Sequence, residues 1–108
     1  MEIPTTLKIG PFEYRVETDN ERLRDEGYLG ETFSHKLLIQ LRQDVAFGQL
    51  RESLLHEVLH AISSTYLPAD SRPLETAIYS LSAGIAQVLL DNADFTRLFL
   101  VDAELDKS

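Results

Sequence analysis

The sequence predicts an α+β fold, in which a small antiparallel sheet of three to four strands packs on a long helix and a second helix follows. Three observations support this prediction. Apolar and polar residues alternate with a period of two up to about residue 41, which is typical of strands with one buried face. Apolar residues then recur at helical spacing over about residues 45–91. No repeat, low-complexity stretch or linker divides the chain, so residues 1–108 are expected to form one domain.

Two strand pairs make up the predicted sheet, which extends over about residues 6–41. In the first pair, TLKI and FEYRVE flank a Gly-Pro turn signal at residues 10–11. In the second pair, YLGETF and KLLIQL are joined through the tripeptide SHK at residues 34–36. The polar stretch TDNERLRDEG between the pairs is expected to hold one short helical turn and to end at Gly27.

Two helices are predicted after the sheet. The first extends over about residues 45–64, with Asp44 as its N-cap, and the second over about residues 72–91, with Ser71 as its N-cap. Two prolines in the stretch TYLPADSRP separate the helices. The apolar stripe expected to bury the second helix consists of Leu74, Ala77, Ile78, Leu81, Ile85, Val88 and Leu89.

Charge and composition exclude several classes of function. The net charge is -8, and ten basic residues are scattered among eighteen acidic ones, whereas a nucleic-acid binder needs a basic patch. We therefore expect no nucleic-acid partner and no membrane partner. No apolar run has the length of a signal peptide or a membrane span, so a cytoplasmic protein is expected. Because the chain contains no cysteine, any metal site must use histidines and carboxylates.

The motif HEVLH at residues 56–60 points to metal chemistry. Residues four apart on an α-helix share one face and lie about 6 Å apart along the axis, so His56 and His60 can reach one zinc ion. Glu57 is rotated by about 100° from His56, and a carboxylate beside the metal can take a proton from zinc-bound water. The alternative is a pair of histidines at the polar edge of a core helix, with Glu57 exposed to solvent.

A catalytic zinc site also needs a third protein ligand and one open coordination position. Glu75 is the preferred candidate, because an αα-hairpin through residues 65–72 would bring it beside the end of the first helix. The alternative role of Glu75 is to stabilise the first turn of its own helix. Asp70, in the loop between the prolines, is the alternative ligand. His35, in the predicted strand turn, is expected at the surface.

The sequence resembles the gluzincin metallopeptidases, in particular the minigluzincins and the short phage-encoded proteins related to the ImmA/IrrE type. The matching stretches are LLHEVLHAI at residues 54–62 and the glutamate that opens the next helix in RPLETAIYSLSAGIAQVLLDN. The order of strands, HEVLH helix and glutamate helix also matches, and the resemblance covers about residues 7–92.

This resemblance implies a zinc-dependent peptidase that acts on a peptide or protein substrate. His56, His60 and Glu75 would be its zinc ligands, and Glu57 would be its general base. Two other functions remain open: a catalytically inactive zinc-binding module that acts through protein contacts, and a metal-free α+β interaction protein. The oligomeric state is left open.

The resemblance bears on substrate binding and regulation as well. It implies that the strand beside the HEVLH helix, at residues 30–33 or 37–41, pairs with an extended peptide. No motif identifies a side chain that stabilises the oxyanion, and Tyr66 and Tyr79 are expected to serve packing or hydrogen bonding instead. The tail over residues 92–108 is expected to hold a short third helix. Its acidic part either covers the metal, as in latent members of the group, or caps the helices.

Overall fold

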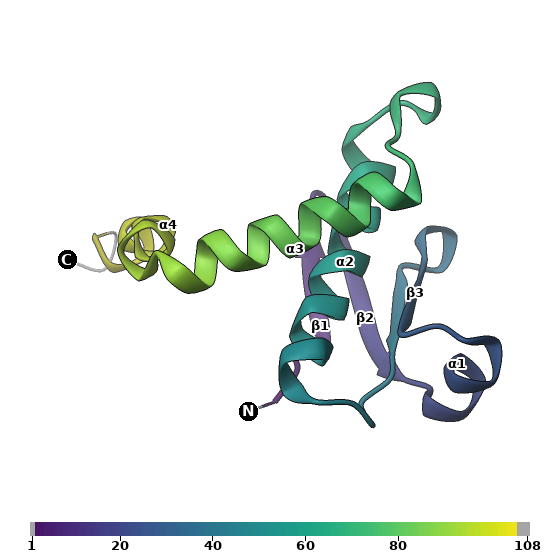
Figure 1. Ribbon diagram of the computed structural model, residues 1–108. Coiled ribbons are helices and arrows are strands. Elements are labelled where there is room, and N and C mark those ends of the chain that lie inside the picture. Colours follow the sequence, from purple (N-terminus) through teal and green to yellow (C-terminus); the bar gives the residue numbers. More distant parts are fainter. Residues whose placement is uncertain (1, 106–108) are drawn as a thin grey trace.

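The structure is a computed structural model that describes the backbone of residues 2–105 and the side chains of residues 2–100 (Figure 1). The predicted α+β class is confirmed, because a sheet near the N-terminus is followed by helices and the long helix α2 packs on that sheet. The elements in chain order are β1 (Thr6–Ile9), β2 (Phe12–Thr18), α1 (Asn20–Glu26), β3 (Gly30–Phe33), the 3-10 turn η1 (Ser34–Lys36), β4 (Leu38–Leu41), α2 (Phe47–Tyr66), the 3-10 turn η2 (Ala69–Ser71), α3 (Glu75–Asp91) and α4 (Ala93–Leu105).

The four strands form one mixed sheet with the order β1-β2-β4-β3. Both predicted hairpins are present, since β1 pairs with β2 and β3 pairs with β4 in antiparallel fashion. The prediction of a wholly antiparallel sheet is wrong, because β2 and β4 are parallel. Strand β4 is the more apolar member of its hairpin, with Leu38, Ile39 and Leu41 all buried, and it takes the central position. The more polar strand β3 is left at the sheet edge.

The polar stretch between the two hairpins folds as the helix α1, as the sequence predicts. Its N-cap is Asp19, whose side chain accepts a hydrogen bond from the backbone N–H of Arg22. Gly27 ends the helix in the left-handed conformation, with φ of 79°. Glycine adopts this conformation without steric cost, which explains why the helix stops there.

The predicted N-cap of the HEVLH helix is wrong. Helix α2 begins at Phe47, and the residue before it, Ala46, offers no side-chain cap. Asp44 instead accepts hydrogen bonds from Arg42, at 2.9 Å, and from Arg24, at 3.1 Å. The guanidinium of Arg42, with a smaller effect from Arg24, lowers the pKa of Asp44. These charged partners hold the carboxylate away from the start of the helix.

The predicted N-cap of the next helix is also wrong. Ser71 lies in the turn η2, and α3 begins only at Glu75. The backbone of Arg72 is extended, with φ of -73° and ψ of 135°. Pro73 explains this, because a proline disfavours the helical conformation of the residue before it. The helix therefore starts just after the proline and carries a carboxylate at its first position.

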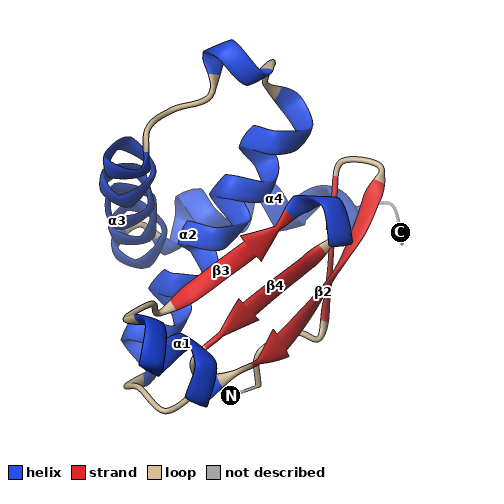
Figure 2. Cartoon of the chain, turned by 90° about the vertical axis from the view of Figure 1, so that its right-hand side faces the viewer, coloured by secondary structure: helices blue, strands red, loops and turns tan. Residues whose placement is uncertain are grey.

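The core lies between α2 and one face of the sheet (Figure 2). The first half of α3 packs on α2, and Ile78 and Ser82 are buried there. Among residues 2–105, no helix is both long enough and apolar enough to cross a membrane. The buried cluster consists of Ile9, Tyr14, Val16, Ile39, Leu41, Leu50 and Ala61.

The predicted buried stripe of the second helix is only partly correct, since Ala77, Ile85 and Leu89 are half-buried. Ile78 is buried, but Leu74, Leu81 and Val88 are exposed. Helix α3 crosses α2 and then continues beyond the domain, with α4 at its far end (Figure 1). Fully buried residues therefore occur only in the first half of α3, whereas its C-terminal end contacts α4. Helix α4 confirms the predicted third helix of the tail.

Candidate metal centre

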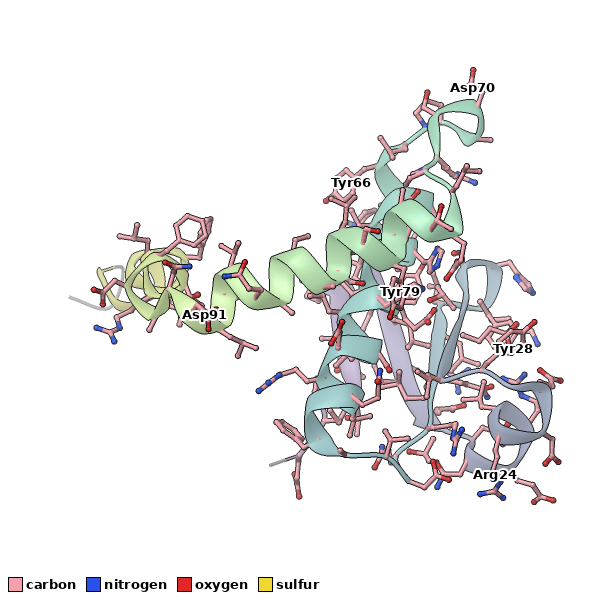
Figure 3. The ribbon with its side chains drawn as sticks, viewed as in Figure 1. Arg24, Tyr28, Tyr66, Asp70, Tyr79 and Asp91 are labelled. Atoms are coloured by element: carbon pink, nitrogen blue, oxygen red, sulfur yellow. The ribbon has the colours of Figure 1, made fainter. Side chains whose placement is uncertain are left out.

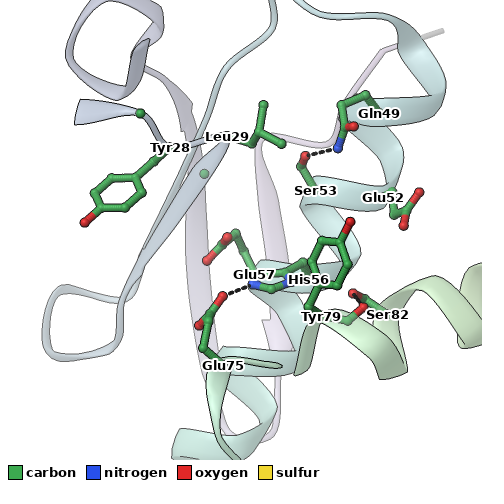
Figure 4. Close-up of a pocket in the computed structure, with 12 residues that line it drawn as sticks. Tyr28, Leu29, Gln49, Glu52, Ser53, His56, Glu57, Glu75, Tyr79 and Ser82 are labelled. Carbon is green, nitrogen blue, oxygen red and sulfur yellow. Dashed lines mark hydrogen bonds and ion pairs between the residues drawn. The ribbon is translucent and has the colours of Figure 1, made fainter. Parts of the chain in front are cut away.

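The structure brings together the two histidines of HEVLH and the glutamate of the following helix. His56 Nε2 lies 2.6 Å from Glu75 Oε1, and His60 Nε2 lies 2.7 Å from Glu75 Oε2 (Figure 4 draws the first contact). The two imidazole rings are neighbours on one face of α2, with centroids 4.9 Å apart. One carboxylate thus bridges both rings. The spacing of four residues on α2 and the start of α3 at Glu75 produce this arrangement.

The connection between α2 and α3 is fixed by Arg72. Its guanidinium donates hydrogen bonds to the carbonyl oxygens of Ser64, at 3.1 Å, and of Leu67, at 3.3 Å. These contacts satisfy carbonyl groups at the C-terminal end of α2, where a positive charge is favourable. Because Arg72 lies only three residues before Glu75, the contacts help to return the chain to the histidines.

The other candidates from the sequence lie outside this cluster. Asp70 is exposed at the tip of the loop between α2 and α3, pointing away from the cluster (Figure 3). The group of possible ligands within residues 2–100 consists of His56, His60 and Glu75 without Asp70. His35 is exposed beside Phe33, so its expected place at the surface is confirmed.

The donor set fits a zinc ion. Two imidazole nitrogens and one carboxylate oxygen form a common ligand set of catalytic zinc sites. Their ligand atoms all lie within 4.8 Å of one another. Ligand atoms around one zinc lie about 3–4 Å apart, so small side-chain movements are sufficient to accommodate the ion. The Glu75 side chain is 67% exposed, which leaves it free to move and leaves one side of the cluster open to solvent.

Glu57 lies beside the cluster and is buried, with 6% of its surface exposed. Thr32 Oγ1 on strand β3 donates a hydrogen bond to Glu57 Oε1 at 2.8 Å and also contacts the Glu57 carbonyl oxygen at 3.0 Å. Burial raises the pKa of Glu57, and the Thr32 hydrogen bond and the two histidines lower it by smaller amounts. A carboxylate whose pKa is raised toward neutral is suited to accept and release a proton.

Gly30 provides the space that Glu57 occupies. A Cβ atom at Gly30 would lie 3.1 Å from Glu57 Cγ and 3.1 Å from the carbonyl oxygen of Gln40. Sequence reasoning missed both Thr32 and Gly30 as parts of the site. The available signal was the position of both residues on the strand expected to lie next to the HEVLH helix. Nothing in the sequence shows that they face Glu57.

Two adjoining cavities flank the cluster, with volumes of about 310 and 490 Å³. Figure 4 shows the first, between β3 and the helices α2 and α3. The edge strand β3 therefore borders open space beside the possible metal ligands. Both cavities are lined by Tyr28, Gly30, Glu57 and Glu75; the first also by Gln49, Glu52, Ser53, His56, Tyr79 and Ser82, and the second also by Glu31, Thr32, Ser34, His60 and Ser64.

The two tyrosines considered from the sequence differ in position. Tyr79 lines the first cavity, and its ring stands edge-on to His56 with centroids 6.3 Å apart (Figure 4). Tyr66 ends α2 and lies near Gly10, on the far side of α3 from the cavity (Figure 3). Because 66% of Tyr79 is exposed, the packing role expected for it stays a prediction.

The described part of the tail does not cover the cluster. Helix α4 lies at the far end of α3 from Glu75 (Figure 1). The 17 residues of α3 separate the two by roughly 25 Å. Helix α4 therefore does not cover the histidine–glutamate cluster in this structure.

No protein-family model matches this chain, and the comparisons with curated proteins and with solved structures returned no match. The resemblance to gluzincins therefore stays a prediction from the HEVLH motif and the order of the elements.

Proposed function

We propose that this protein is a zinc-dependent peptide-bond hydrolase of the gluzincin type. The observation that carries the proposal is the convergence of His56, His60 and Glu75, whose ligand atoms lie within 4.8 Å of one another, beside the buried carboxylate of Glu57. The sequence motif alone places two histidines and a glutamate on one helix. The contact of both histidines with a carboxylate from the next helix adds the third donor that a catalytic site requires.

A bound zinc ion supplies Lewis acidity, which lowers the pKa of water to about 7 and polarises a peptide carbonyl. His56, His60 and Glu75 would hold the ion. Glu57 acts as general base: it accepts a proton from the attacking water and passes it to the leaving amine. Thr32 holds Oε1 of Glu57, so Oε2 remains to carry the proton.

The substrate is proposed to bind as an extended peptide along β3. This strand lies at the sheet edge, so the outer side of its backbone has no strand partner within the described residues. The two cavities along β3 meet at Gly30 and Glu57. A peptide added to this edge passes beside the cluster. A cytoplasmic location suits a chain without cysteine.

The test is hydrolysis of a peptide library by zinc-loaded protein, with the Glu57→Gln variant as the comparison. This variant is expected to bind zinc but to lose activity by about 100-fold or more, because a general base contributes roughly 10²–10⁴. Glu13→Gln is the matched control, since Glu13 is an exposed glutamate on β2 that lines neither cavity. Equal activity of the Glu57→Gln variant and the wild type would refute the assigned role.

The exposed apolar surface of α3 and α4 favours a second candidate, a zinc-binding module that acts through protein contacts. Zinc binding without cleavage of any peptide in the library would support this alternative over the hydrolase. A protein that binds no zinc would leave only the metal-free interaction protein.

A further inference from the structure

The C-terminal half of α3 and the helix α4 form an arm that projects from the domain (Figure 1). Six large apolar side chains on this arm are between 41% and 73% exposed: Val88, Leu90, Phe95, Leu98, Phe99 and Leu100. A patch of this kind on a folded protein marks an interaction surface. We define the arm surface by Val88, Phe95, Leu98, Phe99 and Leu100, together with Leu81, which lies on α3 just before the arm.

The exposed area of the whole chain is larger than that of a compact protein of the same mass, as expected of a chain with a surface that a partner covers. The chain exposes 7479 Å², whereas a compact protein of 12.2 kDa exposes about 6,100 Å². The excess is roughly 1,400 Å² per chain. Two chains that covered this excess would bury roughly 2,800 Å² in total, which lies within the range of homodimer interfaces. The radius of gyration, 14.9 Å, likewise exceeds the roughly 13 Å expected of a compact chain of this length.

The charge distribution allows a second copy of the same chain as the partner. The net charge of -8 makes two copies repel each other over most of their surface. Residues 76–90, however, include no charged side chain, although much of this part of α3 is exposed. Two copies can therefore meet along α3 without bringing like charges together. A basic or acidic partner would gain no electrostatic attraction at this stretch.

A glycine on the exposed helix supports the same conclusion. Gly84 lies three residues after Leu81 and four before Val88, so it shares their face of α3. No atom of the described chain lies within 4 Å of the position where its Cβ would be. Glycine weakens a helix interior relative to alanine, and the single chain offers no compensating contact. Close approach by a helix of another copy would supply one.

We propose that the protein is a homodimer in which the arm surface of each protomer packs on the arm surface of the other about a twofold axis. Such an interface is isologous, so each apolar residue contributes twice. The proposal does not depend on zinc binding or hydrolysis, because the metal cluster lies at the other end of α3.

The experiment is sedimentation velocity of the full chain with EDTA present, at concentrations from one to several hundred micromolar. The wild type is expected to sediment at twice 12.2 kDa. The double variant Leu98→Glu, Phe99→Glu is expected to weaken the dimer by roughly 100-fold or more, because two buried apolar anchors are lost. Leu67→Glu is the matched control, since Leu67 is an exposed leucine outside the arm. Added salt should strengthen the wild-type dimer by screening the repulsion.

Gly84→Gln keeps the test decisive if the double variant does not fold. Its side chain points into open space in the single chain and should increase helix content, which circular dichroism measures, while it weakens the dimer. A wild type of 12.2 kDa at every concentration would overturn the proposal. So would a dimer that persists unchanged in both arm variants. Co-sedimentation of a monomeric wild type with phosphatidylcholine vesicles would assign the arm surface to lipid instead.

Discussion

Replacement of Thr32 by valine tests how the buried carboxylate of the site is held. The Thr32 hydroxyl lies 2.8 Å from Glu57 Oε1, and it is the one side-chain hydrogen bond that the described residues offer this carboxylate. Only 6% of Glu57 is exposed, so water is a poor substitute for the lost donor. Valine has nearly the shape of threonine. The substitution therefore removes the hydrogen bond and leaves the packing almost unchanged.

The expected cost follows from the burial of the acceptor. Leaving a buried acceptor without its donor costs about 1–3 kcal/mol, and we expect Thr32→Val to lower the free energy of unfolding by about 2 kcal/mol. The entropy of unfolding of a chain of 108 residues is roughly 0.23 kcal/mol/K, so the melting temperature should fall by about 9 °C. Thr32→Ser keeps the hydroxyl and should cost clearly less.

The assay is thermal and urea denaturation of metal-free wild type, Thr32→Val and Thr32→Ser, followed by circular dichroism. The order of stability should be wild type, then Thr32→Ser, then Thr32→Val. Equal stability of the valine and serine variants would show that the hydroxyl does not support Glu57, and the reasoning about this contact would be refuted.

Three further predictions concern the metal, the charge of Glu57 and the space around it. Zinc at 1,000 times its Kd should stabilise the protein by about 4 kcal/mol and raise Tm by roughly 18 °C, reversibly with EDTA; an unchanged Tm contradicts a folded metal site. Because burial raises the pKa of Glu57, the folded state resists its ionisation, and the wild type loses stability as pH rises from the ordinary value of 4.5 through the raised folded pKa. The stability of metal-free Glu57→Gln, measured as the urea midpoint, should therefore rise relative to that of the wild type over this pH range. A stability difference that does not change with pH would contradict the raised pKa of Glu57. Gly30→Val should lower stability by about 1–3 kcal/mol and reduce hydrolysis, since its side chain would crowd Glu57 and the carbonyl of Gln40. Gly48→Ala is the control, since Gly48 has open space around it and lines neither cavity; equal effects of the two substitutions would count against the crowding.

The site could be predicted from the sequence as far as its geometry is local. The spacing of His56 and His60 depends only on the helical repeat, and Glu75 follows after a short turn. Thr32 and Glu57, by contrast, are 25 residues apart and meet only because β3 packs beside α2. The apolar and polar pattern of β3 or of α2 does not predict that contact.

The same division explains the errors in the fold. Both hairpins are local and were predicted correctly, but the parallel pairing of β2 with β4 depends on which strand of the second hairpin takes the central position. Asp44 is a good capping residue by type, and two arginines compete for it. The apolar stripe of α3 shows a helix face that avoids water. It does not show whether the partner lies in the same chain or in another one.

The most direct test of the central claim is the zinc content of untagged protein, measured by native mass spectrometry. The account predicts one zinc ion on each wild-type chain, its loss in His60→Ala, a strong reduction in Glu75→Gln and full retention in Asp70→Asn. A wild type without zinc, or a His60→Ala variant with as much zinc as the wild type, would contradict it.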